Sequence, residues 1–152
     1  MTTQKTSDLF LSRASVSPED IEAGSRFAPK FDGDGLIGCV VTEAGTNALL
    51  MFAHMNADAL ARSIDTGYAY FWSRSRKKLW KKGEESGNLL RIVEIRTDCD
   101  QDVLSLTVEV EGAGVACHTG EKSCFYRRIA TRRDGGTVAL ERISSQRSAA
   151  KS

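Results

Sequence analysis

The sequence lacks the features that assign a chain to a membrane or to the secretory route. No apolar run follows a basic start at the N-terminus, so we expect no signal peptide. No apolar stretch approaches the roughly 20 residues of a membrane-spanning helix. The four cysteines are unevenly placed and do not form the framework of a small secreted scaffold. We therefore expect a cytoplasmic protein whose reduced thiols are available for metal.

The chain also lacks an excess of either charge. Its 21 Lys and Arg residues face 20 Asp and Glu residues, and the formal net charge is +1. Such a balance gives no global attraction to nucleic acid or to an anionic membrane, so any preference for anions must come from local clusters. We find no internal repeat and expect one domain, for which 152 residues are enough to form a core.

Turn residues and apolar runs predict an α+β, mainly β domain with one or two short helices. We expect a flexible arm over residues 1–15, the domain over 16–143 and a disordered tail over 144–152, which is rich in Ser, Ala and basic residues. Apolar, β-branched or aromatic runs predict seven strands, at 36–42, 49–55, 68–73, 89–97, 103–111, 123–128 and 137–143. The run 49–55 is apolar on both faces, which predicts a central strand.

Two short helices are predicted from their end signals. Ser17 followed by Pro18 begins the first helix, which ends by Gly24. Asn56 caps the second, which continues to about Thr66 and stops at Gly67, with a buried stripe made of Ala57, Leu60, Ala61 and Ile64.

The segment 98–102 carries three carboxylates and a thiol within five residues. If the segment is extended, Asp98, Asp100 and Asp102 line one face and Cys99 points to the other. Carboxylate oxygens suit a hard cation such as Mg²⁺, whereas thiolates suit Zn²⁺. The spacing of the acids also matches the start of an EF-hand loop, but Val103 occupies the position that requires glycine. The alternative is a solvated turn between two strands, in which Asp is common.

Two further cysteines, Cys117 and Cys124, have six residues between them, and His118 follows the first. Together with Cys99 they offer three thiolates. Three thiolates with an open fourth position make a catalytic zinc site, whereas His118 as a fourth ligand would make a structural one. Spacing alone does not separate these alternatives. Cys39, within an apolar strand, is expected to fill the core.

A basic run covers residues 74–82 and contains no acid. Its Arg and Lys side chains with an interleaved Trp could track a nucleic acid, or the run could be a solvated, flexible loop. A third interpretation is a clamp for a small phosphorylated ligand, to which Ser73 and Ser75 could add hydrogen bonds. The near-zero total charge favours a small anion over a polymer. His54, at a strand end, is expected to be satisfied by a backbone partner.

Taken together, these motifs resemble those of the phosphoribosyl-AMP cyclohydrolases, enzymes of the histidine pathway. The resemblance extends from about Leu36 to Arg127. It is carried by Met55-Asn56, by residues 70–76, by residues 79–84, by Ser86-Gly87, by residues 98–102, by residues 117–120 and by residues 123–126. His54 departs from the family, in which we expect an aromatic residue at this position.

The resemblance implies an intertwined homodimer of mainly β, sheet or barrel-like subunits. It implies a zinc ion shared between subunits, with Cys99 of one chain joining Cys117 and Cys124 of the other. It also implies Mg²⁺ on Asp98, Asp100 and Asp102. The partners would be a small phosphorylated nucleotide and a second copy of the chain, with no nucleic acid and no membrane.

The family reaction is the hydrolytic opening of the adenine ring of phosphoribosyl-AMP between N1 and C6. A zinc-bound hydroxide would attack C6, as in zinc deaminases that act on adenine. Three thiolates acidify such a water less than three histidines do, so a neighbouring base should help. His118 is the candidate for that base. The candidates for binding the phosphates are Ser73, Arg74, Ser75, Arg76, Lys81 and Lys82.

Overall fold

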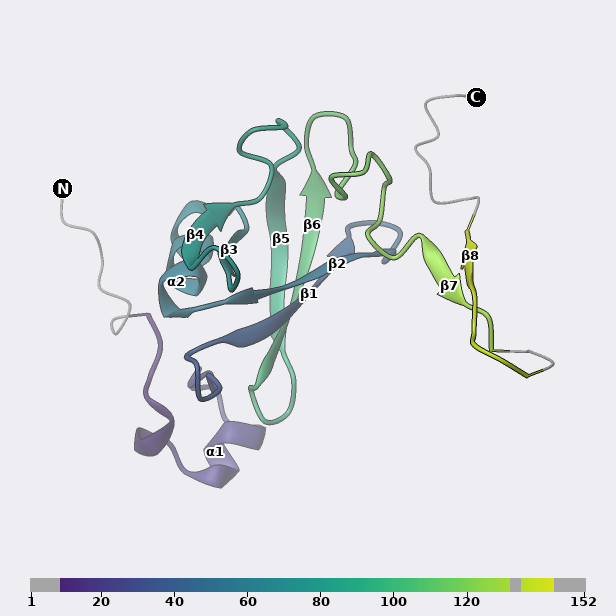
Figure 1. Cartoon of the computed structure of the whole chain (residues 1–152). Coiled ribbons are helices and arrows are strands. Elements are labelled where there is room, and N and C mark those ends of the chain that lie inside the picture. Colours follow the sequence, from purple (N-terminus) through teal and green to yellow (C-terminus); the bar gives the residue numbers. More distant parts are fainter. Residues whose placement is uncertain (1–8, 132–134, 144–152) are drawn as a thin grey trace.

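A four-stranded sheet forms the centre of the molecule (Figure 1). The computed structural model describes residues 9–131 and 135–143. The sheet contains β1 (Ile37–Glu43), β2 (Leu49–Met55), β5 (Leu90–Thr97) and β6 (Val103–Val110), in the order β2-β1-β6-β5. β1 runs parallel to β6, and the other neighbours are antiparallel. The prediction of an α+β, mainly β domain is confirmed.

A second layer covers one end of this sheet. The helix α2 (Ala57–Thr66) contacts β2 and the hairpin made of β3 (Tyr70–Ser73) and β4 (Lys78–Lys81). The buried core lies between the sheet and this layer; its largest fully buried side chains include Phe71, Ile37, Leu50, Met55, Leu60 and Leu106. Cys39 is fully buried among them, as predicted.

The helix ends follow their sequence signals. Asn56 accepts a hydrogen bond from the Ala59 amide (2.8 Å), and Gly67 ends α2 in the left-handed conformation, with φ of 79°. The predicted buried stripe is partly wrong: Ile64 is exposed, whereas Ser63 is buried. The Ser63 hydroxyl bonds the Ala59 carbonyl and accepts from the Tyr70 amide, so a polar residue can face β3.

The position predicted for β2 is wrong. β2 is an edge strand of the sheet, not a central one. It contacts β3 and α2, and its residues Leu50, Met51 and Met55 are buried, whereas Leu49 and Phe52 are exposed. On the free edge of β2, the Leu50 carbonyl accepts a hydrogen bond from the Cys124 amide (2.7 Å). An apolar run on both faces therefore specifies neither the burial of every residue in the strand nor the position of the strand in the sheet.

The N-terminal segment, residues 9–31, packs beneath the β5–β6 turn (Figure 1). It contains a short 3-10 helix η2 (Arg13–Ser15) and α1 (Pro18–Ala23), which begins at the predicted Ser17 cap. Within the predicted arm, the Phe10 ring lies 5.9 Å from that of Phe27 and 6.0 Å from that of Phe31. Residues 1–8 of the predicted arm and the predicted tail 144–152 lie outside the described residues.

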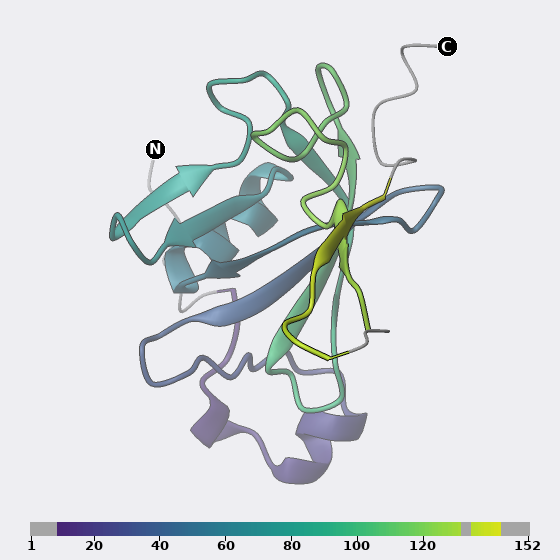
Figure 2. The ribbon, with the colours of Figure 1, turned by 45° about the vertical axis from the view of Figure 1, so that its right-hand side comes forward.

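A C-terminal hairpin, made of β7 (Arg127–Ile129) and β8 (Leu140–Arg142), extends away from the central sheet (Figures 1 and 2). The strand predicted at 123–128 begins only at Arg127, because residues 123–125 are held by bonds to the edge of β2 and to the Ser123 hydroxyl. No helix in residues 9–131 and 135–143 has the length and apolar character needed to cross a membrane.

Candidate functional site

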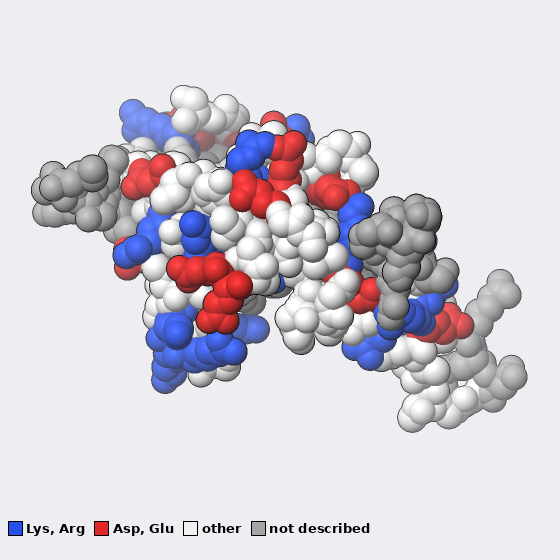
Figure 3. Space-filling view, turned by 90° about the horizontal axis from the view of Figure 1, so that it is seen from above, with Lys and Arg blue, Asp and Glu red and all other residues white. Residues whose placement is uncertain are grey.

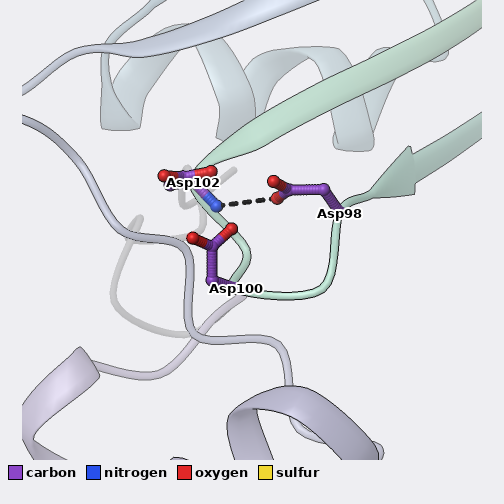
Figure 4. A group of neighbouring side chains, drawn as sticks. All are labelled: Asp98, Asp100 and Asp102. Atoms are coloured by element: carbon purple, nitrogen blue, oxygen red, sulfur yellow. Dashed lines mark hydrogen bonds between the residues drawn. The ribbon is translucent and has the colours of Figure 1, made fainter.

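The acidic segment forms the turn between β5 and β6. The extended conformation considered for it does not occur: the Gln101 amide donates to the Asp98 carbonyl (3.1 Å), and Gln101 has a φ of 56°. The turn nevertheless gathers the carboxylates. Figure 4 shows Asp98, Asp100 and Asp102 around one point, and one oxygen from each lies within 4.8 Å of the others.

Hydrogen bonds set the geometry and the ionisation of this acidic turn. The Asp98 carboxylate accepts from the amides of Asp102 (3.0 Å) and Val103 (3.3 Å). Burial opposes ionisation of Asp98, but hydrogen bonds from Asp100, Asp102 and Val103 outweigh it and lower the pKa of Asp98. The side-chain hydrogen bonds with Asp100 and Asp98, then burial, and then the negative charges of both residues raise the pKa of Asp102.

The donor set of the acidic turn fits a hard cation. A hydrogen bond between two carboxyl groups needs a proton on one of them, so a cation can replace that proton. The Asp100 Oδ1 atom is buried and has no hydrogen-bond partner among the described residues. Oxygen ligands of this kind suit Mg²⁺. Within the described residues, these three are the only group of three or more candidate ligands that lies so close together.

The second candidate centre is the loop 116–124, which brings Cys117 and Cys124 together. The Cys117 amide donates to the Glu121 carbonyl (3.1 Å), and the Ala116 amide donates to the Lys122 carbonyl (3.1 Å), so the loop closes on itself. The bond from the Cys124 amide to Leu50 fixes the second thiol beside β2. The two thiols lie close enough to shift each other's pKa.

The two thiols of this loop differ in their ionisation. Burial raises the pKa of Cys117, but the Thr119 hydroxyl, which donates to its sulfur (3.0 Å), the Thr119 amide and the Cys124 thiol lower it further than burial raises it. Burial and the neighbouring Cys117 raise the pKa of Cys124 to about 11. The positive charge of Lys82 favours the thiolate at both positions.

Cys99 does not join this pair within one chain. It lies exposed in the acidic turn, at the β5 side of the sheet, whereas Cys124 borders β2 at the opposite edge. Three strand spacings separate these edges, which is on the order of 14 Å. The predicted trio of thiolates is therefore not assembled by one copy of the chain, in which Cys99 and Cys124 are both exposed. His118 is exposed in the loop 116–124.

The basic run forms part of a hairpin and is not one flexible loop, because Lys78–Lys81 pair with β3 as β4. Arg74, Ser75 and Arg76 lie exposed in its turn, where the Ser73 hydroxyl accepts from the Arg76 amide (3.2 Å). Lys81 lies 4.9 Å from the centre of the Tyr68 ring. The space-filling view shows acidic and basic side chains interspersed, with one compact basic group (Figure 3).

Two contacts of this hairpin were not predicted from sequence. Lys82, expected to bind phosphate, lies near the thiol pair at one end, with its ammonium 6.0 Å from the Trp80 ring centre. At the other end, Arg74 and Asp32 lie near His54, whose pKa is lowered by burial first and by Arg74 second. Within residues 9–131 and 135–143, the His54 ring has no hydrogen bond to the backbone that would match the predicted partner. Its ring packs edge-on against Phe52, with the ring centres 5.2 Å apart.

Comparison with known proteins identifies the class and the family of this chain. A family model described as phosphoribosyl-AMP cyclohydrolase matches residues 51–126, which include the hairpin, the acidic turn and both loop cysteines. The match places the chain among the hydrolases.

Individual relatives agree. A protein of Brucella canis is 56% identical over 124 residues, which are 82% of this chain and 88% of that protein. A protein of Chelativorans sp. is 52% identical over 135 residues, which are 89% of this chain and 96% of that protein. Both are named phosphoribosyl-AMP cyclohydrolase. The chain belongs to the phosphoribosyl-AMP cyclohydrolase family.

Proposed function

We propose that this protein hydrolyses phosphoribosyl-AMP, opening its adenine ring between N1 and C6 as a step of histidine biosynthesis. The observation that carries the proposal is the likeness to proteins of that name over more than four fifths of the chain. The site supports it, because the hairpin, the acidic turn and the cysteine loop all lie within the matched residues.

Zinc would be held by Cys99, Cys117 and Cys124, with Cys99 supplied by the partner subunit of a homodimer. Two observations support this sharing. Cys117 and Cys124 lie close together, and Cys99 is exposed in the acidic turn, away from both of them within one chain. Sulfur donors are the ligands that zinc prefers. Exposed apolar side chains such as Phe52, Phe125 and Leu140 offer surface for a second subunit.

The residues around the thiols would bind, orient and deprotonate the reactants. Zinc held by three thiolates would supply an activated water, the zinc-bound hydroxide predicted from the sequence. His118, adjacent to Cys117 and exposed, would accept the proton of the attacking water and return it to N1. The ammonium of Lys82 beside the thiols would offset their negative charge.

The phosphates would be bound by the turn of the β3–β4 hairpin and by a metal. Arg74 and Arg76 are exposed there and can form bidentate bonds, with Ser73 and Ser75 next to them and Lys81 further along β4. Mg²⁺ would lie on Asp98, Asp100 and Asp102, whose oxygens converge. The sequence-based expectation of a cytoplasmic location agrees with a role in amino-acid biosynthesis.

The test is to follow ring opening by absorbance together with bound zinc. We expect chelation to abolish activity and added zinc to restore it. Cys99→Ala, Cys117→Ala and Cys124→Ala should each lose both zinc and activity. Cys39→Ser, which changes a buried cysteine away from the site, is the matched control and should keep both. Full activity in a zinc-free variant would refute the proposal.

The role of His118 has its own test. His118→Ala should lower kcat by roughly 100- to 10,000-fold, the usual contribution of a general base. Zinc content should stay at the level of the unmodified protein, since His118 is not among the proposed ligands. Undiminished turnover with zinc intact would remove His118 from the mechanism.

A further inference from the structure

Gln101 differs from the rest of the acidic turn because its side chain is buried. It is 5% exposed, whereas Asp98, Cys99 and Asp102 are exposed. It also has a left-handed backbone, with φ of 56°, which a residue other than glycine adopts only where its surroundings hold it.

The Gln101 side chain is fastened to the N-terminal segment by three hydrogen bonds. Its Oε1 atom accepts from the Ala28 amide (2.8 Å). Its Nε2 atom donates to the carbonyls of Ile21 (3.0 Å) and Arg26 (3.2 Å). In the backbone, the Lys30 amide donates to the Gln101 carbonyl (2.8 Å). The donors and the acceptor of the amide group all have partners, so its orientation is fixed.

The N-terminal segment is itself held in place. Val16, Ile21 and Ala28 form a small buried cluster of their own, and Phe10, Phe27 and Phe31 pack on the main core. The Arg13 guanidinium donates to the carbonyls of Asp100 (2.5 Å) and Ala28 (3.3 Å), which adds a second attachment to the acidic turn.

These bonds explain how three carboxylates stay within 4.8 Å of one another. Like charges repel, and a left-handed non-glycine residue resists its own conformation, so an unattached turn would open and separate the carboxylates. Among the three carboxylates of the described acidic turn, only that of Asp98 accepts hydrogen bonds from backbone amides. The remaining support comes through Gln101 and Arg13.

We propose that Gln101 is a positioning residue: anchored on the N-terminal segment, it holds Asp98, Asp100 and Asp102 in the arrangement that binds a divalent cation. This inference rests on the proposed function, which assigns Mg²⁺ to these carboxylates. It adds a role for a residue that touches neither metal nor substrate, and for a segment that lies before the residues of the family match.

Two substitutions separate the backbone of Gln101 from its amide. Gln101→Gly adopts a positive φ readily and removes the side chain. Gln101→Asn tolerates the same φ, but its amide is one methylene too short to reach the N-terminal segment. Ser63→Ala is the matched control, because it removes a buried polar group with backbone partners in α2 and β3, away from the acidic turn.

The measurement is the binding of Mn²⁺, used in place of Mg²⁺, to zinc-loaded protein without substrate, followed by electron paramagnetic resonance. We expect the Kd for Mn²⁺ to rise about 10- to 100-fold in both Gln101 variants, the usual effect of losing a support of a metal ligand. Zinc content is measured in the same samples, because Cys99 lies in the same turn, and Mn²⁺ affinities are compared at equal zinc content. Ser63→Ala should bind Mn²⁺ as the unmodified protein does. In the activity assay, the Mg²⁺ concentration for half-maximal rate should rise by the same factor.

Unchanged Mn²⁺ affinity in folded Gln101→Gly would overturn the inference. If the Gln101 variants do not fold, Arg13→Met decides: weaker Mn²⁺ binding supports the anchoring role, and unchanged binding refutes it. Failure of the proposed metal site looks different. In that case the unmodified protein binds Mn²⁺ no better than Asp98→Asn does, and the inference falls with the site.

Discussion

At the scale of single residues, the surroundings give one kind of side chain different roles. Burial raises the pKa of Cys39 to about 12, so this thiol is an inert part of the core. Burial and the neighbouring Cys117 raise the pKa of Cys124 to about 11. The hydrogen bonds from Thr119 lower the pKa of Cys117, so Cys117 is the more easily deprotonated of the two thiols. In the proposed zinc site, Cys117 would therefore lose its proton more readily than Cys124.

Glu43 shows the same dependence on surroundings in a carboxylate. Its side chain pairs with Lys122 (2.8 Å) and accepts from the Thr46 hydroxyl (2.6 Å). These bonds, Lys122 first, lower the pKa of Glu43 below 4.5. Since Lys122 lies between Cys117 and Cys124, the pair ties the cysteine loop to the end of β1.

A pH-dependent loss of stability is therefore expected from Glu43→Gln. A carboxylate with a lowered pKa in the folded state stabilises the protein above its unfolded pKa, and this contribution disappears as the pH falls through the folded pKa. The variant should be less stable by about 0.5 kcal/mol at pH 7, because the pair is partly exposed. The difference should shrink below about pH 4.

Urea unfolding at pH 7 and at pH 3.5 measures this difference. Glu94→Gln, which removes an exposed charge paired with Arg96 on β5, controls for the loss of a carboxylate alone. A deficit for Glu43→Gln that stays the same at both pH values would contradict the assignment.

At the scale of elements, the β3–β4 hairpin and the loop that follows it place Lys82 near the thiols. Gly83 comes directly after Lys82 and has a φ of 84°. A Cβ atom at Gly83 would lie 2.2 Å from the Asn88 carbonyl oxygen and 2.6 Å from the Leu89 nitrogen. These are backbone atoms, so the loop itself would have to move, and Lys82 with it.

The substitution Gly83→Ala should consequently destabilise the protein more than Gly87→Ala, which changes a glycine four residues further along the chain. Both positions have a φ of 84°, but nothing lies within 4 Å of a Cβ at Gly87. Gly87→Ala should cost about 1–2 kcal/mol for the left-handed backbone. Gly83→Ala should add roughly 1–3 kcal/mol for overpacking. Urea unfolding of both variants checks this, and equal losses would show that the close approach is unimportant.

At the scale of the whole molecule, the proposed zinc site needs two copies of the chain. The sheet keeps Cys99 at one edge and the pair Cys117 and Cys124 at the other. The exposed apolar side chains on β2 and on the β7–β8 hairpin, among them Phe52, Ile129 and Leu140, agree with contact between subunits.

Mixing two inactive variants tests whether the site is shared. In a heterodimer of Cys99→Ala and Cys117→Ala, one of the two shared sites is complete, because each chain supplies what the other lacks. Refolding the two together should restore zinc and activity to about a quarter of the unmodified level, since random pairing gives half heterodimers, each with one of two sites.

The control is a mixture of Cys117→Ala and Cys124→Ala. Both cysteines come from the same chain in each shared site, so no pairing of these variants completes one. Activity in this control, or its absence from the first mixture when heterodimers are present, would exclude a zinc shared in the proposed way.

The sequence by itself determined the local features of this protein and the chemistry that it offers. The β1–β2 hairpin, the caps Ser17 and Asn56 and the stop at Gly67 follow from short-range conformational preferences. The motifs identified the family because residue type and spacing are properties of the chain alone. Where local chemistry decides the conformation, the sequence is sufficient.

Only the tertiary structure decided the order of the strands and the contacts between residues that are distant in sequence. It placed β2 at an edge, folded 98–102 into a turn fastened by Gln101, and brought Lys82 to the thiols while keeping Cys99 away from them. Each of these contacts joins residues distant in sequence, across strands whose order no local pattern specifies. Strand order depends on how the apolar faces of the whole chain are buried together, which is a property of the folded molecule.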